Sequence, residues 1–172
     1  MEKNEFIEFL LTRRSIRKFT DEDVPLDLVK RIVDTARFAP SAKNRQPWEF
    51  IVVKDRSRLE ELSKAYPWAG PLKAAKAAVA VVVDPKTSPV THLIDGANAT
   101  MYLLFAAHAL GLGGVWINAI ASEEMKKILN VPDDKVLLSV VALGWPAEKP
   151  EPRPRKNLEE VLHLEEYGRK KI

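Results

Sequence analysis

The chain has 172 residues, 46% of them hydrophobic and 30% charged, which suffices to bury a core and is typical of one soluble, globular domain. Its net charge of +3 is too small to favour bulk binding of nucleic acid, and a local anion site fits that charge better. Because the chain contains no cysteine, disulfides, thiolate metal sites and cysteine nucleophiles are excluded.

No segment of the sequence predicts contact with a membrane. The stretch from Met1 to Glu5 lacks the basic-then-apolar pattern of a signal peptide. The longest apolar stretch, Met101 to Val115, is interrupted by His108 and by glycines, and it is too short to span a bilayer. We therefore expect a cytoplasmic protein.

The N-terminal segment joins a short apolar helix pattern at residues 6–10 to a strongly basic corner. Four cationic side chains surround the hydroxyl of Ser15 where this helix should end, namely Arg13, Arg14, Arg17 and Lys18. Guanidinium forks bind phosphate through two hydrogen bonds at once, and a hydroxyl and backbone N–H groups can complete such a site. These residues alone fit a phosphate site and a solvated basic patch equally well.

Helix and strand patterns alternate in the next part of the chain. The periodicity predicts helices over residues 26–38 and 58–65, and buried strands over residues 49–54 and 78–84. Pro40 ends the first helix and opens a polar loop at residues 41–47. The unbroken apolar run of the second strand indicates a sheet that is covered on both faces.

The longest predicted helix, Thr91 to Leu110, is rich in alanine and apolar almost all round, so we expect it to be the central buried helix. Asp95 is a polar exception on it, and either a buried, hydrogen-bonded structural group or a site residue fits. A short strand at residues 115–117, a helix that Ser122 is expected to cap, and a strand at residues 136–143 follow.

Beyond Gly144 the composition changes, because prolines at positions 146, 150, 152 and 154 alternate with basic residues. Such a run predicts an extended arm near polyproline II geometry, followed by a short helix at residues 158–162. We see no internal repeat. We therefore expect residues 1–172 to form a single domain, with residues 145–172 as an extended C-terminal arm and helices on both faces of the sheet.

Catalysis by side chains has no clear candidate in this sequence. The glycine-rich stretch at residues 111–114 follows a helix and precedes a strand, the reverse of the order in a dinucleotide-binding fingerprint. His92, His108 and His163 lack the spacing of metal ligands and are expected to be core or surface residues. No nucleophile elbow supports a triad, so we expect a cofactor to carry the chemistry.

Four motifs resemble the FMN-dependent nitroreductase family, in the family's order along nearly the whole chain. They are Arg13-Arg14-Ser15-Ile16-Arg17, the stretch from Ala39 to Trp48, the stretch from Gly111 to Ile117, and Leu143-Gly144-Trp145-Pro146 followed by Pro152-Arg153-Pro154-Arg155. The length is that of the compact members. The resemblance implies an α+β, three-layer sandwich with a central mixed sheet flanked by helices, and an intertwined homodimer that binds two FMN molecules at its interface.

The resemblance also implies which residues bind FMN. They are Arg13, Arg14, Ser15, Arg17, Pro40, Ser41, Asn44, Asn118, Ala119, Arg153 and Arg155. The two ends of the chain would meet at the phosphate, through Arg13 and Ser15 on one side and the arginines of the arm on the other. Arg17 would lie at the flavin pyrimidine, where a cation stabilises the charge at N1 and O2 of the reduced ring.

Two further segments receive a role only from the resemblance. The loop with Pro40, Ser41 and Asn44 would reach the cofactor from the partner subunit, although these residue types also suit a plain turn after a helix. Backbone N–H groups at Asn118 and Ala119 would approach flavin O4 and N5. The large side chains of Trp48 and Trp116 are next to strands, and we expect both to be core residues rather than flavin-stacking ones.

The activity that the resemblance implies is hydride transfer from NAD(P)H through flavin N5 to an acceptor such as a nitroaromatic or a quinone. NAD(P)H and the acceptor would occupy the same open face of the flavin in turn, which gives ping-pong kinetics. The expected partners are NAD(P)H, a small-molecule acceptor and a second copy of the chain, but neither nucleic acid nor a membrane. Two alternatives remain open, namely a relative with different flavin chemistry and a non-catalytic module that binds flavin or another anion.

Overall fold

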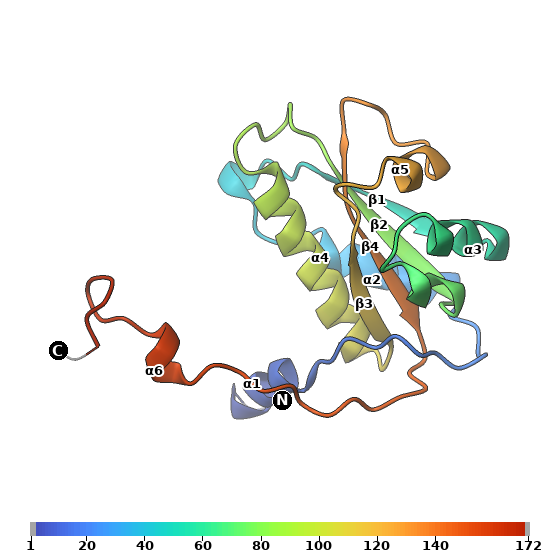
Figure 1. Cartoon of the computed structure of the whole chain (residues 1–172). Coiled ribbons are helices and arrows are strands. Elements are labelled where there is room, and N and C mark those ends of the chain that lie inside the picture. The colour runs from blue at the N-terminus through green and yellow to red at the C-terminus, as the bar shows by residue number, and fades with distance from the viewer. Residues whose placement is uncertain (1–2, 171–172) are drawn as a thin grey trace.

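The computed structural model describes residues 3–170, and a four-stranded antiparallel sheet lies at its centre (Figure 1). The sheet contains β1 (Trp48–Val53), β2 (Ala77–Val83), β3 (Gly113–Asn118) and β4 (Val136–Gly144) in the order β1-β2-β4-β3. The expected α+β architecture is confirmed, but the pairing within the sheet is antiparallel throughout rather than mixed. The reason is that β2 and β3 run in the same direction but are separated by β4, the last strand, which runs opposite to both.

Helices cover both faces of the sheet and make the molecule three-layered. On one face, α2 (Leu26–Ala36) and α4 (His92–Ala109) pack against the sheet and against each other. On the other face lie α3 (Arg56–Lys64), α5 (Glu123–Ile128) and a short 3₁₀ helix, η2 (Gly70–Lys73). Successive side chains of β2 point to opposite cores, which is why its sequence is apolar without interruption.

The remaining helices belong to the two ends of the chain and to one loop. α1 (Lys3–Thr12) precedes the basic corner, and α6 (Leu158–Val161) lies in the C-terminal arm. A second 3₁₀ helix, η1 (Ala42–Asn44), forms inside the loop expected at residues 41–47, and neither 3₁₀ helix was predicted. Ser122 caps α5 as predicted, since its side chain accepts a hydrogen bond from the Met125 N–H.

The basic corner crosses the ends of β3 and β4, and glycines make this crossing possible. Ile16 donates its N–H to the Gly114 carbonyl at 3.0 Å, and Thr20 donates to the Trp145 carbonyl at 2.9 Å. A Cβ on Gly113 would lie 2.7 Å from side-chain atoms of Ile16, closer than packed atoms ever approach. The glycine-rich stretch therefore serves close packing of two chain segments.

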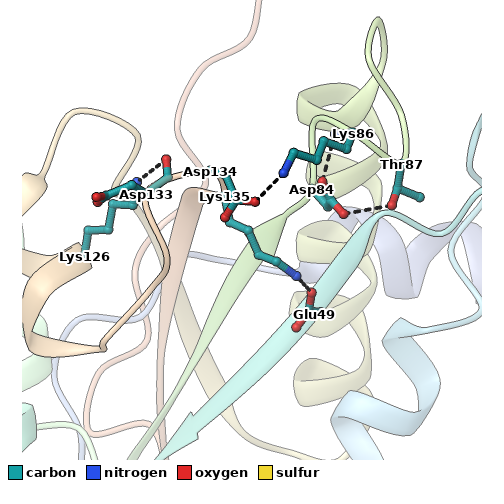
Figure 2. Close-up of polar contacts among 8 residues, drawn as sticks. All are labelled: Glu49, Asp84, Lys86, Thr87, Lys126, Asp133, Asp134 and Lys135. Carbon is teal, nitrogen blue, oxygen red and sulfur yellow. Dashed lines mark hydrogen bonds and ion pairs between the residues drawn. The ribbon is translucent and has the colours of Figure 1, made fainter.

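A polar cluster closes the other end of the sheet (Figure 2). Lys86 pairs with Asp134 at 2.7 Å between Nζ and Oδ2, and Lys135 pairs with Glu49 on β1. Asp84 follows β2 and accepts hydrogen bonds from the Lys86 N–H and the Thr87 hydroxyl. These contacts connect the loop after β2 to the segment that leads into β4.

After Trp145 the chain leaves the sheet as an arm that extends away from the body toward α6 (Figure 1). Every residue from 151 to 162 is exposed, so this part of the arm packs against nothing substantial in its own chain. Across residues 3–170, no helix is long and apolar enough to cross a membrane.

Candidate functional site

The two ends of the chain meet at a basic hollow of about 160 Å³. We use this name for the site lined by Arg13, Arg14, Ser15, Arg17, Pro150, Glu151, Arg153 and Arg155. The tertiary fold thus brings together the N-terminal basic corner and the arginines of the arm, which are separated by well over a hundred residues in sequence.

The arginines of the basic hollow repel one another. Burial lowers the pKa of Arg13, and the nearby positive charges of Arg14 and Arg155 lower it further. Within residues 3–170, no ion pair neutralises any arginine of the hollow. An arginine cannot relieve this repulsion by losing its proton, so a bound anion would stabilise the cluster.

Glu148 holds the arm against the basic corner, a role that sequence reasoning missed. One of its carboxylate oxygens accepts the N–H groups of Arg17 at 2.6 Å and Lys18 at 3.1 Å. The Lys18 carbonyl in turn accepts the Ala147 N–H at 3.0 Å. The only signal in the sequence was an acidic residue between the prolines of the arm, which is too common to predict such a contact.

From the basic hollow, further hollows follow the exposed edge of β3. One, of about 490 Å³, is lined by Arg17, Pro67, Trp68, Gly70, Pro71, Val115 and Trp116. The next, of about 550 Å³, is lined by Leu93, Ile94, Ala97, Asn98, Trp116, Asn118, Ile120 and Leu138. Neighbouring hollows share Arg17 and Trp116, so we treat the three as one surface and call it the β3 groove.

The β3 groove is long enough for an extended ligand with a phosphate at one end. β3 pairs along its whole inner side with β4, and in the part of the chain that the structure describes no strand pairs with its outer side, where only Ser15 and Ile16 contact Gly114. From Gly113 to Asn118 the strand rises about 16 Å. A ligand whose phosphate occupies the basic hollow would place its other end near Asn118.

The two tryptophans expected in the core differ. Trp48 is 7% exposed and lies in the core, as predicted. Trp116 is partly buried, because it packs against the same core and also lines the β3 groove, so its assignment to the core holds only in part. Its position on an edge strand explains the difference, because no neighbouring strand covers that side of the ring.

The turn after β3 offers fewer free N–H groups than expected. Asn118 is exposed at the end of the strand, whereas Ala119 is buried and donates its N–H to the Leu138 carbonyl at 3.1 Å. The Ile120 N–H makes only a long contact, 3.3 Å, with the Asn118 side chain. Of these two N–H groups, that of Ile120 is therefore the more available for a hydrogen bond to a ligand.

Asp95 fixes the loop that contains Pro40, Ser41 and Asn44. It is 2% exposed and accepts hydrogen bonds from the Ala42 N–H at 3.0 Å and from the Thr91 hydroxyl at 2.9 Å. The structural reading of Asp95 is thus confirmed. The loop needs such support because the backbone at Lys43 and Asn44 has φ values of 54° and 55°, in the left-handed region.

The loop and the basic hollow lie toward opposite ends of α4. Asp95, which holds the loop, is near the start of this helix, whereas His108, near its end, lines a cavity together with Arg13. The helix rises about 20 Å between these two residues. Pro40, Ser41 and Asn44 line none of the three hollows of their own chain, so within one subunit they do not join the other predicted site residues.

The histidines do not form a metal site. Across residues 3–170, no group of three or more His, Asp or Glu side chains could hold a metal ion. His108 stacks on Phe9 and contacts the Thr12 hydroxyl at 3.0 Å. Burial lowers the pKa of His108, and the charge of Arg13 lowers it further, so the neutral form is favoured.

Comparison with known proteins places these features in a family. The family model of the nitroreductase family matches residues 10–83 and 65–145. A protein of Methanothermobacter thermautotrophicus, assigned as an NADH dehydrogenase/NAD(P)H nitroreductase, is 36% identical over 96% of this chain and 89% of its own length.

Two solved structures share the fold along nearly the whole chain. One, assigned as an NADH dehydrogenase/NAD(P)H nitroreductase from Parabacteroides distasonis, has a TM-score of 0.90 and 32% identity, and the match covers 96% of this chain and 100% of that one. The other is assigned as a nitroreductase from Desulfovibrio desulfuricans and was solved in complex with FMN. It has a TM-score of 0.87 and 29% identity, and the match covers 96% of this chain and 99% of that one.

Proposed function

This chain belongs to the nitroreductase family, and from that premise we propose that it is an FMN-dependent oxidoreductase that passes hydride from NAD(P)H to a nitroaromatic or quinone acceptor. The observation that carries the proposal is the basic hollow, where arginines from both ends of the chain surround a space without a neutralising ion pair among residues 3–170. A terminal phosphate is a dianion that such a site would bind.

The residues of the β3 groove fit FMN along its length. Arg13 and Ser15, with the arginines of the arm, would hold the phosphate, and Arg17 would lie beside the ring, because it lines both the basic hollow and the adjoining one. When bound, FMN supplies the hydride-accepting and hydride-donating atom at N5. The protein's part is to bind, to orient and to provide positive charge, and no side chain has to transfer a proton.

A second copy of the chain would complete the site. Exposed apolar side chains follow one side of α4, with Ile94 62% exposed and Tyr102 38% exposed, and such a surface is typical of a subunit interface. In a symmetric homodimer, the loop with Pro40, Ser41 and Asn44 would reach the partner's β3 groove rather than its own. The exposed arm would cover the partner in the same way.

The visible spectrum of the purified protein tests the cofactor directly. We expect a yellow protein, and acid treatment should release FMN rather than FAD, because the hollow has room for a terminal phosphate. NADH and NADPH should then be tried in turn as reductants, with a nitroaromatic or a quinone as acceptor. A colourless protein that takes up no FMN on titration would overturn the proposal, and one that binds FMN without turnover would be a binding module.

A further inference from the structure

Trp68 is 78% exposed, although the backbone around it is firmly held. Ala69 and Leu72 are fully buried on either side of the turn. The Ala69 N–H donates to the Tyr66 carbonyl at 3.0 Å, and the Leu72 N–H donates to the Ala69 carbonyl at 2.9 Å. The firmly held backbone thus exposes a large indole to solvent. This exposure of apolar surface is unfavourable, and the indole adds nothing to the packing of the core.

Prolines limit the movement of this support further. Pro67 precedes the indole directly, and Pro71 lies within η2, where its fixed φ suits the start of a short helix. A backbone held this way loses little conformational entropy when a ligand binds. The backbone thus keeps the indole of Trp68 in position to contact a ligand or another molecule.

The surroundings of Trp68 indicate what that ligand is. The indole lines the same part of the β3 groove as Arg17 and Trp116, between the phosphate end and the Asn118 end. This part of the groove is walled by two indoles and one guanidinium, all of which stack well on flat, conjugated rings. No carboxylate lines it, so nothing there repels a ring that carries negative charge.

We propose that Trp68 is a specificity-determining residue that stacks on the ring of a planar aromatic acceptor, such as a quinone or a nitroaromatic, while that acceptor occupies the site. The inference rests on the proposed function, because it takes the ring of FMN to lie beside Arg17. It narrows the acceptors to flat conjugated molecules that are wide enough to reach from the flavin to the indole. The indole would not strengthen the binding of compact inorganic oxidants, because they have no ring to stack on it.

Three variants test this role with a matched control. Trp68→Ala removes the ring and Trp68→Phe restores a flat aromatic surface. Lys73→Ala changes an exposed side chain of η2, the 3₁₀ helix that follows Trp68, at a position that does not line the groove. Each protein is examined for FMN affinity by titration, for mass by light scattering, and for the equilibrium dissociation constant of 1,4-naphthoquinone from the oxidised holoprotein by dialysis. The KM values for naphthoquinone and for ferricyanide are then compared.

For Trp68→Ala we expect the dissociation constant and the KM of naphthoquinone to rise about fivefold to tenfold, the size expected for loss of one stacking partner. The KM for ferricyanide, the FMN affinity and the mass should stay unchanged. Trp68→Phe should recover most of the naphthoquinone affinity, and Lys73→Ala should behave like the parent protein.

Other outcomes would overturn the inference and show what Trp68 does instead. A weaker FMN affinity in Trp68→Ala would make the indole part of the cofactor site, and a lower mass would make it a subunit contact. Equal loss for naphthoquinone and ferricyanide would contradict stacking. If the parent protein itself binds no FMN, it is the proposed function that fails, and this result is recognisable before any variant is made.

Discussion

The basic hollow differs from an ordinary charged surface because its cations are arginines rather than lysines. A lysine cluster could lower its own repulsion by releasing protons, whereas a guanidinium stays charged at any ordinary pH even when its pKa is lowered. Burial, and after it the positive charges of Arg14 and Arg155, lower the pKa of Arg13, so its charged form is held in an unfavourable place that a bound anion would improve. In the proposed site, the Ser15 hydroxyl would add a hydrogen bond of the kind that orients a phosphate, whereas the N–H groups of Ile16, Arg17 and Lys18 are already bonded within the protein.

Arg13 and Arg17 should have separable effects on cofactor binding and cofactor potential. Arg13→Ala should weaken FMN binding by about 1.5–3 kcal/mol, because it removes a charged hydrogen-bond donor to the phosphate, and the bound flavin should keep a near-normal potential. Arg17→Ala should lose less affinity but lower the potential, because the reduced anionic ring loses its nearby cation. A flavin titration and a redox titration of both variants measure these effects.

Arg56→Ala, on α3, controls for the loss of one positive charge at a residue that lines no part of the β3 groove. The roles assigned to the two arginines would be wrong if Arg17→Ala left the potential unchanged while Arg13→Ala shifted it.

Asp95→Asn should loosen the loop at residues 40–46 more than the rest of the protein. The carboxylate accepts the Ala42 N–H and two hydroxyl groups in a buried place, and an amide cannot accept from all three. We expect the free energy of unfolding to fall by about 1–3 kcal/mol. Hydrogen exchange of the Ala42 amide should also become faster.

Asp27→Asn, at an exposed position of α2, should change neither quantity. Unchanged exchange at Ala42 in the Asp95 variant would show that the loop is held by other contacts.

At the scale of elements, the crossing of the basic corner over the sheet depends on backbone proximity. Segment 15–20 hydrogen-bonds to β3 on one side and to the start of the arm on the other, so one short segment places both halves of the basic hollow. Side chains on the strands beneath it would push it away. The glycines at positions 113 and 144 have Cβ positions that would overlap Ile16 and Phe19.

Gly113→Ala should therefore disturb the site as well as the fold. Its methyl group would meet Ile16 close to the backbone, where the side chain cannot swing aside, and overpacking of this kind costs about 1–3 kcal/mol. We expect lower stability in urea unfolding together with weaker FMN binding. Gly70→Ala is the matched control for stability alone, because nothing lies within 4 Å of the Cβ position there, whereas the residue itself lines the β3 groove.

The polar cluster at the far end of the sheet should give the protein acid sensitivity (Figure 2). Hydrogen bonds from the Lys86 N–H and the Thr87 hydroxyl lower the pKa of Asp84. A carboxyl whose pKa is lower in the folded state stabilises the fold above its unfolded pKa of about 3.9, and this contribution is lost as the pH falls through the folded pKa.

Asp84→Asn should thus be less stable than the parent at pH 7, and the difference should shrink as the pH falls toward about 2. Urea unfolding across this range measures it, with Glu22→Gln as a control for the loss of an exposed carboxylate. A difference that is constant with pH would show that the Asp84 charge makes no contribution.

At the scale of the whole molecule, the arm contributes residues to the site but packs little against the rest of its own subunit. It is pinned at Glu148, adds two arginines to the basic hollow, and then extends with every residue from 151 to 162 exposed. Exposed apolar residues on α6 and α4 have no cover within one subunit. Both facts are explained if a second subunit lies there.

Truncation after Pro150 should therefore lower both FMN affinity and dimer stability. The double variant Arg153→Ala/Arg155→Ala is its matched control, since it removes the charges and keeps the arm. We expect the double variant to bind FMN weakly yet remain a dimer, and the truncated protein to dissociate. Light scattering and FMN titration separate the two effects. A truncated protein that stays dimeric would place the interface elsewhere.

Local patterns in the sequence were enough for most of the elements. The helices and strands, the cap at Ser122 and the arm after Gly144 follow from periodicity, capping chemistry and proline content, which depend on neighbouring residues only. The 3₁₀ helices were not predicted because they occupy three or four residues and leave no periodic signal. The antiparallel pairing was not predicted because it depends on where β4 inserts in the sheet, which no local pattern contains.

The candidate site divides along the same line. The sequence alone determined that the chain has a basic corner and a basic arm, and that its nucleophilic and metal-ligating side chains lack any recognisable spacing. Only the tertiary structure brought Arg13 and Arg155 to one hollow, placed the partly buried Trp116 in the wall of the β3 groove, and placed the loop of Ser41 at the far end of α4. The physical reason is that residue chemistry is local, whereas proximity between distant segments is decided by how the layers pack.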